Sequence, residues 1–342
     1  MVFFAHVTFG YFHHFYDGNA SLAKFARYFA NFGTFGVELF FVISGFVIIP
    51  SCIKYSPREF AGRRFWRLYP LFAMFTIFYF IMNHFLPQDP GREHLSFLLS
   101  NLMFMDLFLG TTPLTPNAWS ITFEIWYYAA SYLLIYALIR RADRFNPIVA
   151  VLGIAFACFM IAAYDITAYF VGGAFLYYIN RTFLKGEFTF ANKTIVTAFA
   201  LMAVGVLATI WNIVPPKTYF EVPGLQLISF LSLVATLLLV LLLMHEDNLF
   251  SRLLVSKTLR FFGTISYSLY LTHPYTYILV RQIGYKLRLG SHPWEATLPL
   301  YLLANVCLAV GVAWIVHKIV EVGPYRLIYD SRIYRQPDTQ MS

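Results

Sequence analysis

The chain has 342 residues, of which 59% are hydrophobic and only 12% are charged, and its formal net charge is +8. A soluble globular domain carries roughly 25% charged residues, so the composition excludes that class. Continuous apolar stretches of ~20 residues recur along the chain and predict transmembrane helices rather than barrel strands, which would alternate every second residue. The Lys and Arg residues form short clusters between these stretches, which is typical of topology signals and not of a nucleic-acid surface.

We predict an all-α, polytopic membrane bundle of about ten transmembrane helices. The predicted spans, in chain order, are Met1–Tyr11, Gly33–Pro50, Leu68–Phe85, Ile121–Ile139, Ile148–Tyr164, Ala168–Ile179, Ile195–Val214, Leu227–Met244, Ile265–Ile283 and Leu298–His317. A further apolar segment, Leu95–Gly110, is short and follows a polar stretch, so we expect it to be re-entrant or interfacial. No repeat or linker marks a second domain. We therefore expect one membrane domain over residues 1–326 and a polar cytoplasmic tail over residues 327–342.

The first predicted span is too short to cross a membrane by itself. It offers about a dozen residues, or about 18 Å of helix, against a hydrocarbon core of about 30 Å. No basic region precedes it and no small-residue cleavage site follows it, which disfavours a signal peptide. We expect the first helix to be truncated at its N-terminus, with the natural start of the protein upstream of Met1.

The distribution of Lys and Arg predicts the orientation. If the connection around residues 51–67 is cytoplasmic and the sides alternate from there, 18 of the 25 basic residues lie inside. The seven that remain outside are Lys24, Arg27, Arg92, Lys217, Arg281, Lys286 and Arg288. This bias follows the positive-inside rule and predicts a cytoplasmic C-terminus.

The three cysteines are far apart in the sequence, and each lies within or beside an apolar stretch: Cys52, Cys158 and Cys307. Their spacing predicts neither a disulfide framework nor a zinc site. We therefore expect no bound metal.

Among the His and Glu residues of the predicted spans, four stand out: His6, Glu38, Glu124 and His273. An ionisable group in hydrocarbon costs at least ~2.5–3.5 kcal/mol, so each is a candidate for function.

Two polar stripes accompany these residues. Glu124 shares a helix face with Ser120, Tyr127 and Ser131, and His273 shares one with Ser266, Tyr270 and Tyr277. The stripes predict a shared polar interior. For the Ser and Tyr members, hydrogen bonding between helices without chemistry is an equal alternative.

The connection from Ser56 to Pro70 holds the densest group of basic residues. Ser56 and Glu59 form a capping box, and Pro57 takes the first helical position, so a helix should begin here. We expect Glu59 to pair with Arg63 at i+4, which places Arg64 and Arg67 on a neighbouring face at the cytoplasmic membrane boundary. Two guanidinium groups there suit phosphates, and an orientation anchor on lipid headgroups is the alternative.

Six segments, in order, resemble the integral membrane acyltransferase family 3. They are Phe3-Phe-Ala-His6-Val, Gly36-Val-Glu-Leu-Phe-Phe-Val-Ile-Ser-Gly-Phe46, Arg64-Phe-Trp-Arg67-Leu-Tyr-Pro, Trp119-Ser-Ile-Thr-Phe-Glu124, Ile265-Ser-Tyr-Ser-Leu-Tyr-Leu-Thr-His273-Pro and Glu321-Val-Gly-Pro-Tyr-Arg326. Two features depart from the family: its Arg-Gly lead-in before the first histidine is missing, and Glu38 stands where Asp is common. The second segment is most similar to the exopolysaccharide-modifying branch.

The resemblance implies transfer of an acyl group, usually acetyl, from cytoplasmic acyl-CoA to a hydroxyl of an exopolysaccharide, lipopolysaccharide or related glycan. Arg64 and Arg67 would hold the CoA phosphates, and the pantetheine arm would reach toward His6 as the general base. Glu38 or Glu124 would orient the imidazole, or His6 would carry the acyl group covalently. Trp119, Ser120, Tyr270 and His273 would bind the acceptor.

The implied setting is a bacterial inner membrane, crossed several times, with acyl-CoA as co-substrate and no tightly bound cofactor. The expected partners are a glycan or lipid-linked glycan acceptor, membrane lipids and glycan-assembly machinery, and not nucleic acid. A transporter of a glycan or acylated precursor is the main alternative, although the sequence lacks the repeats typical of transporters. A membrane scaffold is the other, but it would not need His, Glu and paired Arg in these positions.

Overall fold

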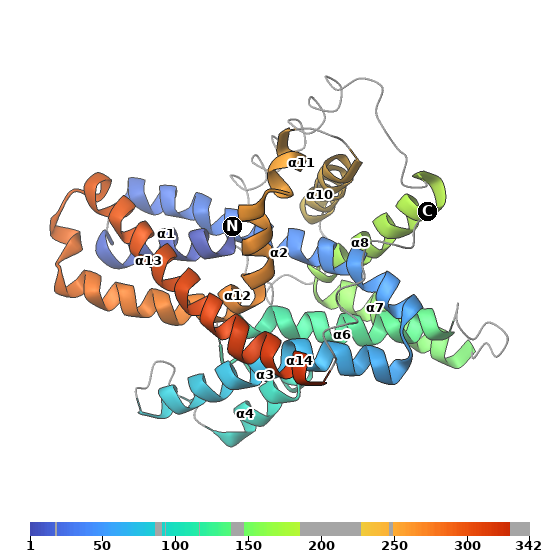
Figure 1. Ribbon diagram of the computed structural model, residues 1–342. Coiled ribbons are helices and arrows are strands. Elements are labelled where there is room, and N and C mark those ends of the chain that lie inside the picture. The colour runs from blue at the N-terminus through green and yellow to red at the C-terminus, as the bar shows by residue number, and fades with distance from the viewer. Residues whose placement is uncertain are drawn as a thin grey trace. The chain divides into compact units, whose positions relative to one another are not determined.

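The computed structural model describes residues 1–17, 19–85, 91, 92, 94–115, 117–137, 147–184, 227–245 and 249–328. Within these ranges every regular element is a helix and none is a strand (Figure 1). The prediction of an all-α fold is therefore confirmed for the described part of the chain.

The described helices are named here in the order of the chain. In chain order they are α1 (Val2–Phe15), α2 (Ala20–Lys54), α3 (Pro57–Phe85), α4 (Leu95–Leu102), α5 (Asp106–Leu109), α6 (Ala118–Ile135), α7 (Pro147–Ala163), α8 (Thr167–Ile179), the π-helix η3 (Asn180–Leu184), α10 (Leu227–His245), α11 (Leu249–Leu254), α12 (Lys257–Lys286), the 3₁₀ turn η4 (Leu289–Ser291), α13 (Trp294–Val316), the π-helix η5 (His317–Glu321) and α14 (Val322–Ile328).

Nine of the ten predicted spans overlap described helices, and the tenth, Ile195–Val214, lies outside the described residues, as do residues 138 and 139 at the end of the span predicted from Ile121. Three helical stretches in the described ranges are long and apolar enough to cross a membrane: Phe35–Lys54, Pro57–Phe85 and Trp294–Arg326. Pro147–Ala163 and Phe230–Met244 are shorter apolar helices. The segment Leu95–Gly110 forms the two short helices α4 and α5, and neither is long enough to span the membrane.

The chain divides into two compact units. The first contains residues 1–55 and 123–261, and the second contains residues 56–122 and 262–342. Helices α6 and α12 each contribute residues to both units.

Glycines hold the helices of the first unit close together. A Cβ on Gly33 of α2 would lie 2.6 Å from the Cβ of Ala5 on α1, so the two helices pack with almost no side chain between them. Farther along α2, a Cβ on Gly45 would collide with the carbonyl oxygen of Phe170 on α8, and one on Gly173 would collide with that of Val42. Small residues allow such close backbone approach in membrane bundles.

Aromatic rings fill the space beside this crossing. Phe170 of α8 stacks on Phe41 of α2, with ring centroids 4.0 Å apart, and on Tyr127 of α6, with centroids 4.3 Å apart. The Tyr127 hydroxyl also donates a hydrogen bond to the Phe170 carbonyl oxygen at 3.1 Å. One side chain thus joins α2, α6 and α8 in the core of the first unit.

Tyrosines link the long helices of the second unit. Tyr267 and Tyr275 of α12 donate hydrogen bonds to the carbonyl oxygens of Leu68 and Phe75 on α3, at 2.7 and 3.2 Å. The Tyr275 ring also stacks on the Phe75 ring, with centroids 5.1 Å apart. These contacts fix α12 against α3 and position the candidate site residues that both helices carry.

Candidate functional site

The first turn of α3 has the local structure that its sequence predicts. The helix begins at Pro57, and the Ser56 hydroxyl accepts a hydrogen bond from the Glu59 amide at 3.4 Å. Arg63 pairs with Glu59 at 2.8 Å, and it also donates to the Tyr325 hydroxyl of α14 at 3.2 Å. The predicted i+4 pair of Arg63 with Glu59 is therefore confirmed, and the same side chain also holds α14 against α3.

Arg64 and Arg67, which follow Arg63 along α3, have different surroundings. Arg64 is partly buried and lies 5.9 Å from the centre of the Phe60 ring, whereas Arg67 is exposed. Stacking on an aromatic ring restrains a guanidinium group while leaving its charge intact. Of the three arginines between residues 63 and 67, one thus contacts another helix, and the other two are those that the sequence predicts to bind phosphate.

The start of α6 meets the middle of α12 through hydrogen bonds. The Ser120 and Tyr270 hydroxyls lie 2.7 Å apart, and the Tyr270 hydroxyl also donates to the Asn117 carbonyl oxygen at 3.2 Å. The Asn117 side-chain amide donates to the Tyr270 carbonyl oxygen. The two polar stripes predicted from the sequence therefore meet at Ser120 and Tyr270.

Other members of these stripes lie close to this cluster or apart from it. His273 is buried one turn beyond Tyr270, with ring centroids 6.1 Å apart, and its Nδ1 lies 3.2 Å from the Leu269 carbonyl oxygen. Trp119 is partly buried beside Ser120. Ser266 is exposed and donates to the Gly263 carbonyl oxygen of its own helix, so it does not line the interior.

His6 and Glu38 both lie in the first unit, on the neighbouring helices α1 and α2. His6 lies in the first half of α1. The Glu38 carboxylate accepts a hydrogen bond from Ser232 of α10 at 3.3 Å. Gly33 and Gly36 of α2 face α1. Because a helical turn takes 3.6 residues, the Cα of Glu38 lies on the opposite side of α2 from these two glycines.

Glu124 is the most deeply buried of the predicted catalytic carboxylates, at 4% exposure. It accepts a hydrogen bond from the hydroxyl of Tyr128, one turn along α6. Glu38 and Glu124 thus each have a hydroxyl donor, which is the usual condition for a carboxylate inside a protein.

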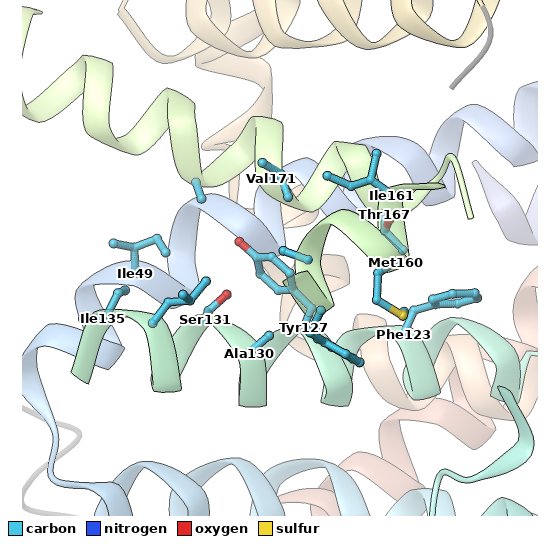
Figure 2. Close-up of a pocket in the computed structure, with 14 residues that line it drawn as sticks. Ile49, Phe123, Tyr127, Ala130, Ser131, Ile135, Met160, Ile161, Thr167 and Val171 are labelled. Atoms are coloured by element: carbon cyan, nitrogen blue, oxygen red, sulfur yellow. The ribbon is translucent and has the colours of Figure 1, made fainter. Parts of the chain in front are cut away.

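An apolar cavity of about 220 Å³ lies in the first unit between α6, α7 and α8 (Figure 2). The cavity contains few polar groups, and these come from Tyr127 and Ser131 of α6 and Thr167 of α8. Its walls suit a hydrocarbon chain and offer no charge to a phosphate or a carboxylate.

Sequence reasoning missed a buried polar group at the end of α13. The Glu321 carboxylate accepts a hydrogen bond from Ser268 of α12 at 2.6 Å and lies 2.9 Å from Nδ1 of His317. The sequence places Glu321 in a family motif without indicating its role, and no spacing singles out His317 or Ser268. The carboxylate belongs to a π-helical turn, a distortion that is frequent at functional sites.

Asp106, at the start of α5, was also missed. It is 2% exposed and accepts a hydrogen bond from the Thr122 hydroxyl of α6 at 2.9 Å. Burial raises the pKa of Asp106 to about 6, although the hydrogen bond from Thr122 acts in the opposite direction. Its position within the apolar run Met103–Leu109 was the signal that could have identified it.

No described part of the chain brings together three or more His, Cys, Asp or Glu side chains in a group that could hold a metal ion. The free cysteines of the described residues are Cys52, which is buried, and Cys158 and Cys307, which are exposed.

Comparison with known proteins identifies relatives of the chain. The chain is similar to the O-acetyltransferase OatA of Staphylococcus aureus strains NCTC 8325, COL and MRSA252. In each case the identity is 27% over 330 residues, covering 84% of this chain and 52% of the relative. The chain thus spans about half the length of the curated relatives it matches. No solved structure matches it.

A family model described as an acyltransferase domain matches residues 1–318, which include every predicted site residue. The exopolysaccharide branch is not distinguished by these matches. The motifs in their order and the match over nearly the whole chain lead to one conclusion: this chain belongs to the acyltransferase 3 family.

Proposed function

We propose that the protein is a membrane O-acyltransferase that moves an acetyl group from cytoplasmic acetyl-CoA to a sugar hydroxyl of an exopolysaccharide, lipopolysaccharide or related envelope glycan. The observation that carries the proposal is the family match over residues 1–318, together with the similarity to proteins named O-acetyltransferase. The setting is a bacterial inner membrane that the chain crosses about ten times, with the C-terminus in the cytoplasm.

The donor site is formed by the first turns of α3. Arg64 and Arg67 bind the phosphates of acetyl-CoA through charge-assisted hydrogen bonds. Two features support this assignment: the predicted cytoplasmic position of the turn, and the engagement of Arg63 with Glu59 and Tyr325, which gives Arg63 a separate structural role.

His6 is the general base of the proposed transfer. As the sugar hydroxyl oxygen bonds to the thioester carbonyl carbon, Nε2 or Nδ1 of His6 takes the hydroxyl proton. The carbon–sulfur bond then breaks, and the CoA thiolate leaves with the electron pair and takes up a proton. The place of His6 in the family motif Phe3-Phe-Ala-His6-Val, within the matched residues 1–318, supports this role. In a second route, His6 itself carries the acetyl group before the sugar attacks.

The two carboxylates of the first unit support the base indirectly. Glu38 and Glu124 accept hydrogen bonds from Ser232 and Tyr128, which hold both carboxylates in the same unit as His6. We assign the acceptor to the second unit, where Trp119 and His273 flank the hydrogen-bonded pair of Ser120 and Tyr270. Hydroxyl groups in such a cluster can exchange their hydrogen bonds for those of a sugar.

The experiment supplies labelled acetyl-CoA to membranes that contain the wild type, His6→Ala, Arg67→Ala or the control Arg58→Ala. Arg58 is exposed on the first turn of α3, about two and a half turns before Arg67, and has no role in the proposal. We expect label in the envelope glycan with the wild type and Arg58→Ala, and a loss of about a hundredfold or more with His6→Ala. Equal labelling by all four proteins would refute the catalytic assignment and leave transport as the better account.

A further inference from the structure

A second polar cluster lies between α12 and α13, in the unit that carries the proposed acceptor site. Tyr277 and Arg281 are spaced i,i+4 on α12, and Tyr301 and Asn305 are spaced i,i+4 on α13. Each pair therefore lies on one face of its helix. Tyr301 interacts with Tyr277 and Arg281 across the two helices and with Asn305 on its own, so the four side chains form one group.

The cluster is buried within the bundle. Tyr301 is 3% exposed and Asn305 is fully buried, while Tyr277 and Arg281 are partly buried. The Arg281 guanidinium carbon lies 5.5 Å from the centre of the Tyr277 ring. The Asn305 amide donates to the Tyr301 carbonyl oxygen at 2.8 Å, and Asn305 Oδ1 has no hydrogen-bond partner among the described residues.

A buried hydrogen-bond acceptor without a donor, such as Asn305 Oδ1, costs about 1–3 kcal/mol of stability unless a ligand or a water molecule donates to it.

The cluster continues the face of α12 that carries Tyr270 and His273, because Tyr277 and Arg281 follow them at helical spacing. It therefore extends the proposed acceptor site toward the outer end of α12. Arg281 is also one of the few cations that the predicted topology places outside, so the positive-inside rule gives no reason for it.

We propose that this cluster binds an anionic group of the acceptor glycan, and thereby selects an acidic acceptor. Arg281 would hold the anionic oxygens, the hydroxyls of Tyr277 and Tyr301 would donate to them, and Asn305 Oδ1 would accept from a sugar hydroxyl. The anion is a carboxylate of an acidic sugar or a phosphate of a lipid-linked glycan, since both match a guanidinium fork. This inference rests on the proposed glycan O-acetyltransferase activity.

Competition between matched sugars tests the inference on the intact protein. Membranes transfer label from saturating acetyl-CoA to their own glycan in the presence of glucose, glucuronate or glucose 6-phosphate, and the inhibition constant of each sugar is measured. Saturation with acetyl-CoA limits competition at Arg64 and Arg67. We expect at least one of the two anionic sugars to inhibit the wild type at a concentration about tenfold lower than glucose does, because a hydrogen bond to a charged group contributes about 1.5–3 kcal/mol.

The variants assign the effect to the cluster. Arg281→Gln should bring the ratio of the inhibition constants close to one, and Tyr301→Phe should lower it in part. The control Lys286→Gln removes an exposed charge beyond the cluster, on the last turn of the same helix, and should retain the wild-type ratio. The stronger of the two anionic inhibitors then identifies the carboxylate or the phosphate as the source.

Each contrary result has a defined meaning. If glucose inhibits the wild type as strongly as both anionic sugars do, the inference is wrong although the acetyl transfer stands. The inference is also wrong if Arg281→Gln still prefers the anionic sugars to glucose as strongly as the wild type does. If the wild-type membranes transfer no label to any glycan, the proposed function fails and the inference falls with it.

Discussion

Among single residues, the neighbouring arginines Arg63, Arg64 and Arg67 of α3 differ in their contacts. Arg63 donates hydrogen bonds to Glu59 and Tyr325. Arg64 lies over the Phe60 ring, and Arg67 is exposed. The sequence predicted the Glu59 pair through i+4 spacing. It could not predict Tyr325, because that contact joins residues 262 positions apart in the chain.

Replacing Arg67 by Ala should weaken donor binding more than catalysis. We expect KM for acetyl-CoA to rise about tenfold, with a smaller change in kcat, because a charge-assisted hydrogen bond to phosphate contributes about 1.5–3 kcal/mol. Steady-state kinetics with acetyl-CoA and its 3′-dephospho analogue measure the effect. The analogue should bind the wild type more weakly than acetyl-CoA does. An unchanged KM in Arg67→Ala would remove Arg67 from the donor site.

Asp106 makes the stability of the protein depend on pH. Burial raises the pKa of this carboxyl from 3.8 to about 6, so the folded state binds a proton that the unfolded state has already released between these values. The contribution of Asp106 to stability is therefore largest below about pH 4 and is lost as the pH rises through about 6.

Asp106→Asn should consequently stabilise the protein at pH 7.5 but not at pH 4. Asparagine keeps an oxygen that accepts from Thr122 and carries no charge to bury. The pKa difference corresponds to an upper value of about 3 kcal/mol at neutral pH. Thermal unfolding in detergent at both pH values, followed by size-exclusion chromatography, measures the change. A gain of equal size at pH 4 would show that the charge is not the cause.

At the scale of elements, the antiparallel contact of α2 with α8 depends on two glycines. Gly45 lies against the backbone of Phe170, and Gly173 lies against that of Val42 and Phe46. A methyl group at either position meets backbone atoms, which cannot rotate away as a side chain would. The helices would have to separate, and the stacking of Phe170 on Phe41 and Tyr127 would loosen.

Gly173→Ala should therefore destabilise the first unit, by about 1–3 kcal/mol, the usual cost of overpacking. Gly311→Ala is the matched control, because a Cβ at that position of α13 meets nothing within 4 Å. Alanine also favours the helix over glycine there. The midpoint of thermal unfolding should fall for Gly173→Ala and stay level or rise for Gly311→Ala. The reverse order would contradict the close crossing.

Hydropathy predicted the existence of the helices better than their ends. The apolar stretch from Gly33 gave the core of α2, but the helix begins at Ala20, where the side chain of Asn19 accepts hydrogen bonds from the amides of Ser21 and Leu22. Lys24 and Arg27 lower the hydropathy of that first part without breaking the helix. Basic residues also lower the hydropathy of the first turns of α12, so the prediction began at Ile265 although the helix starts at Lys257.

Contacts between distant helices were the least predictable part of the site. Helical spacing identified Ser120 and Tyr270 as members of polar stripes, and the structure joins them directly. Spacing could not identify the partner of Glu321, because Ser268 lies 53 positions away. Nor could it exclude Ser266, whose exposure depends on which face of α12 the neighbouring helices cover.

At the scale of the whole molecule, the positive-inside pattern predicts which connections face the cytoplasm. Part of that pattern, including Arg140, Arg141, Arg144, Lys185, Lys193, Lys217, Arg332 and Arg335, lies outside the described residues, as does most of the predicted tail, 329–342. The predicted topology can be tested at one described position on each side of the membrane. Ser56 precedes α3 on the predicted inner side, and Ser291 follows α12 on the outer side.

Single cysteines at these two positions should differ in their reaction with a membrane-impermeant maleimide. In a variant without the native cysteines, Ser291→Cys should be labelled in intact cells, because it faces outward. Ser56→Cys should be labelled only after the membrane is permeabilised. Both serines are exposed, so burial does not confound the comparison. Labelling of Ser56→Cys in intact cells would invert the topology and place Arg64 and Arg67 away from cytoplasmic CoA.

The central claim is that the protein acetylates an envelope glycan and that His6 performs the chemistry. The most direct measurement is the O-acetyl content of the surface glycan, by mass spectrometry, in a deletion strain that carries the wild type, His6→Ala or no copy of the protein. We expect acetylated sugar units with the wild type alone, and a reduction of about a hundredfold or more with His6→Ala at equal protein levels. A glycan that is equally acetylated in all three strains would contradict it.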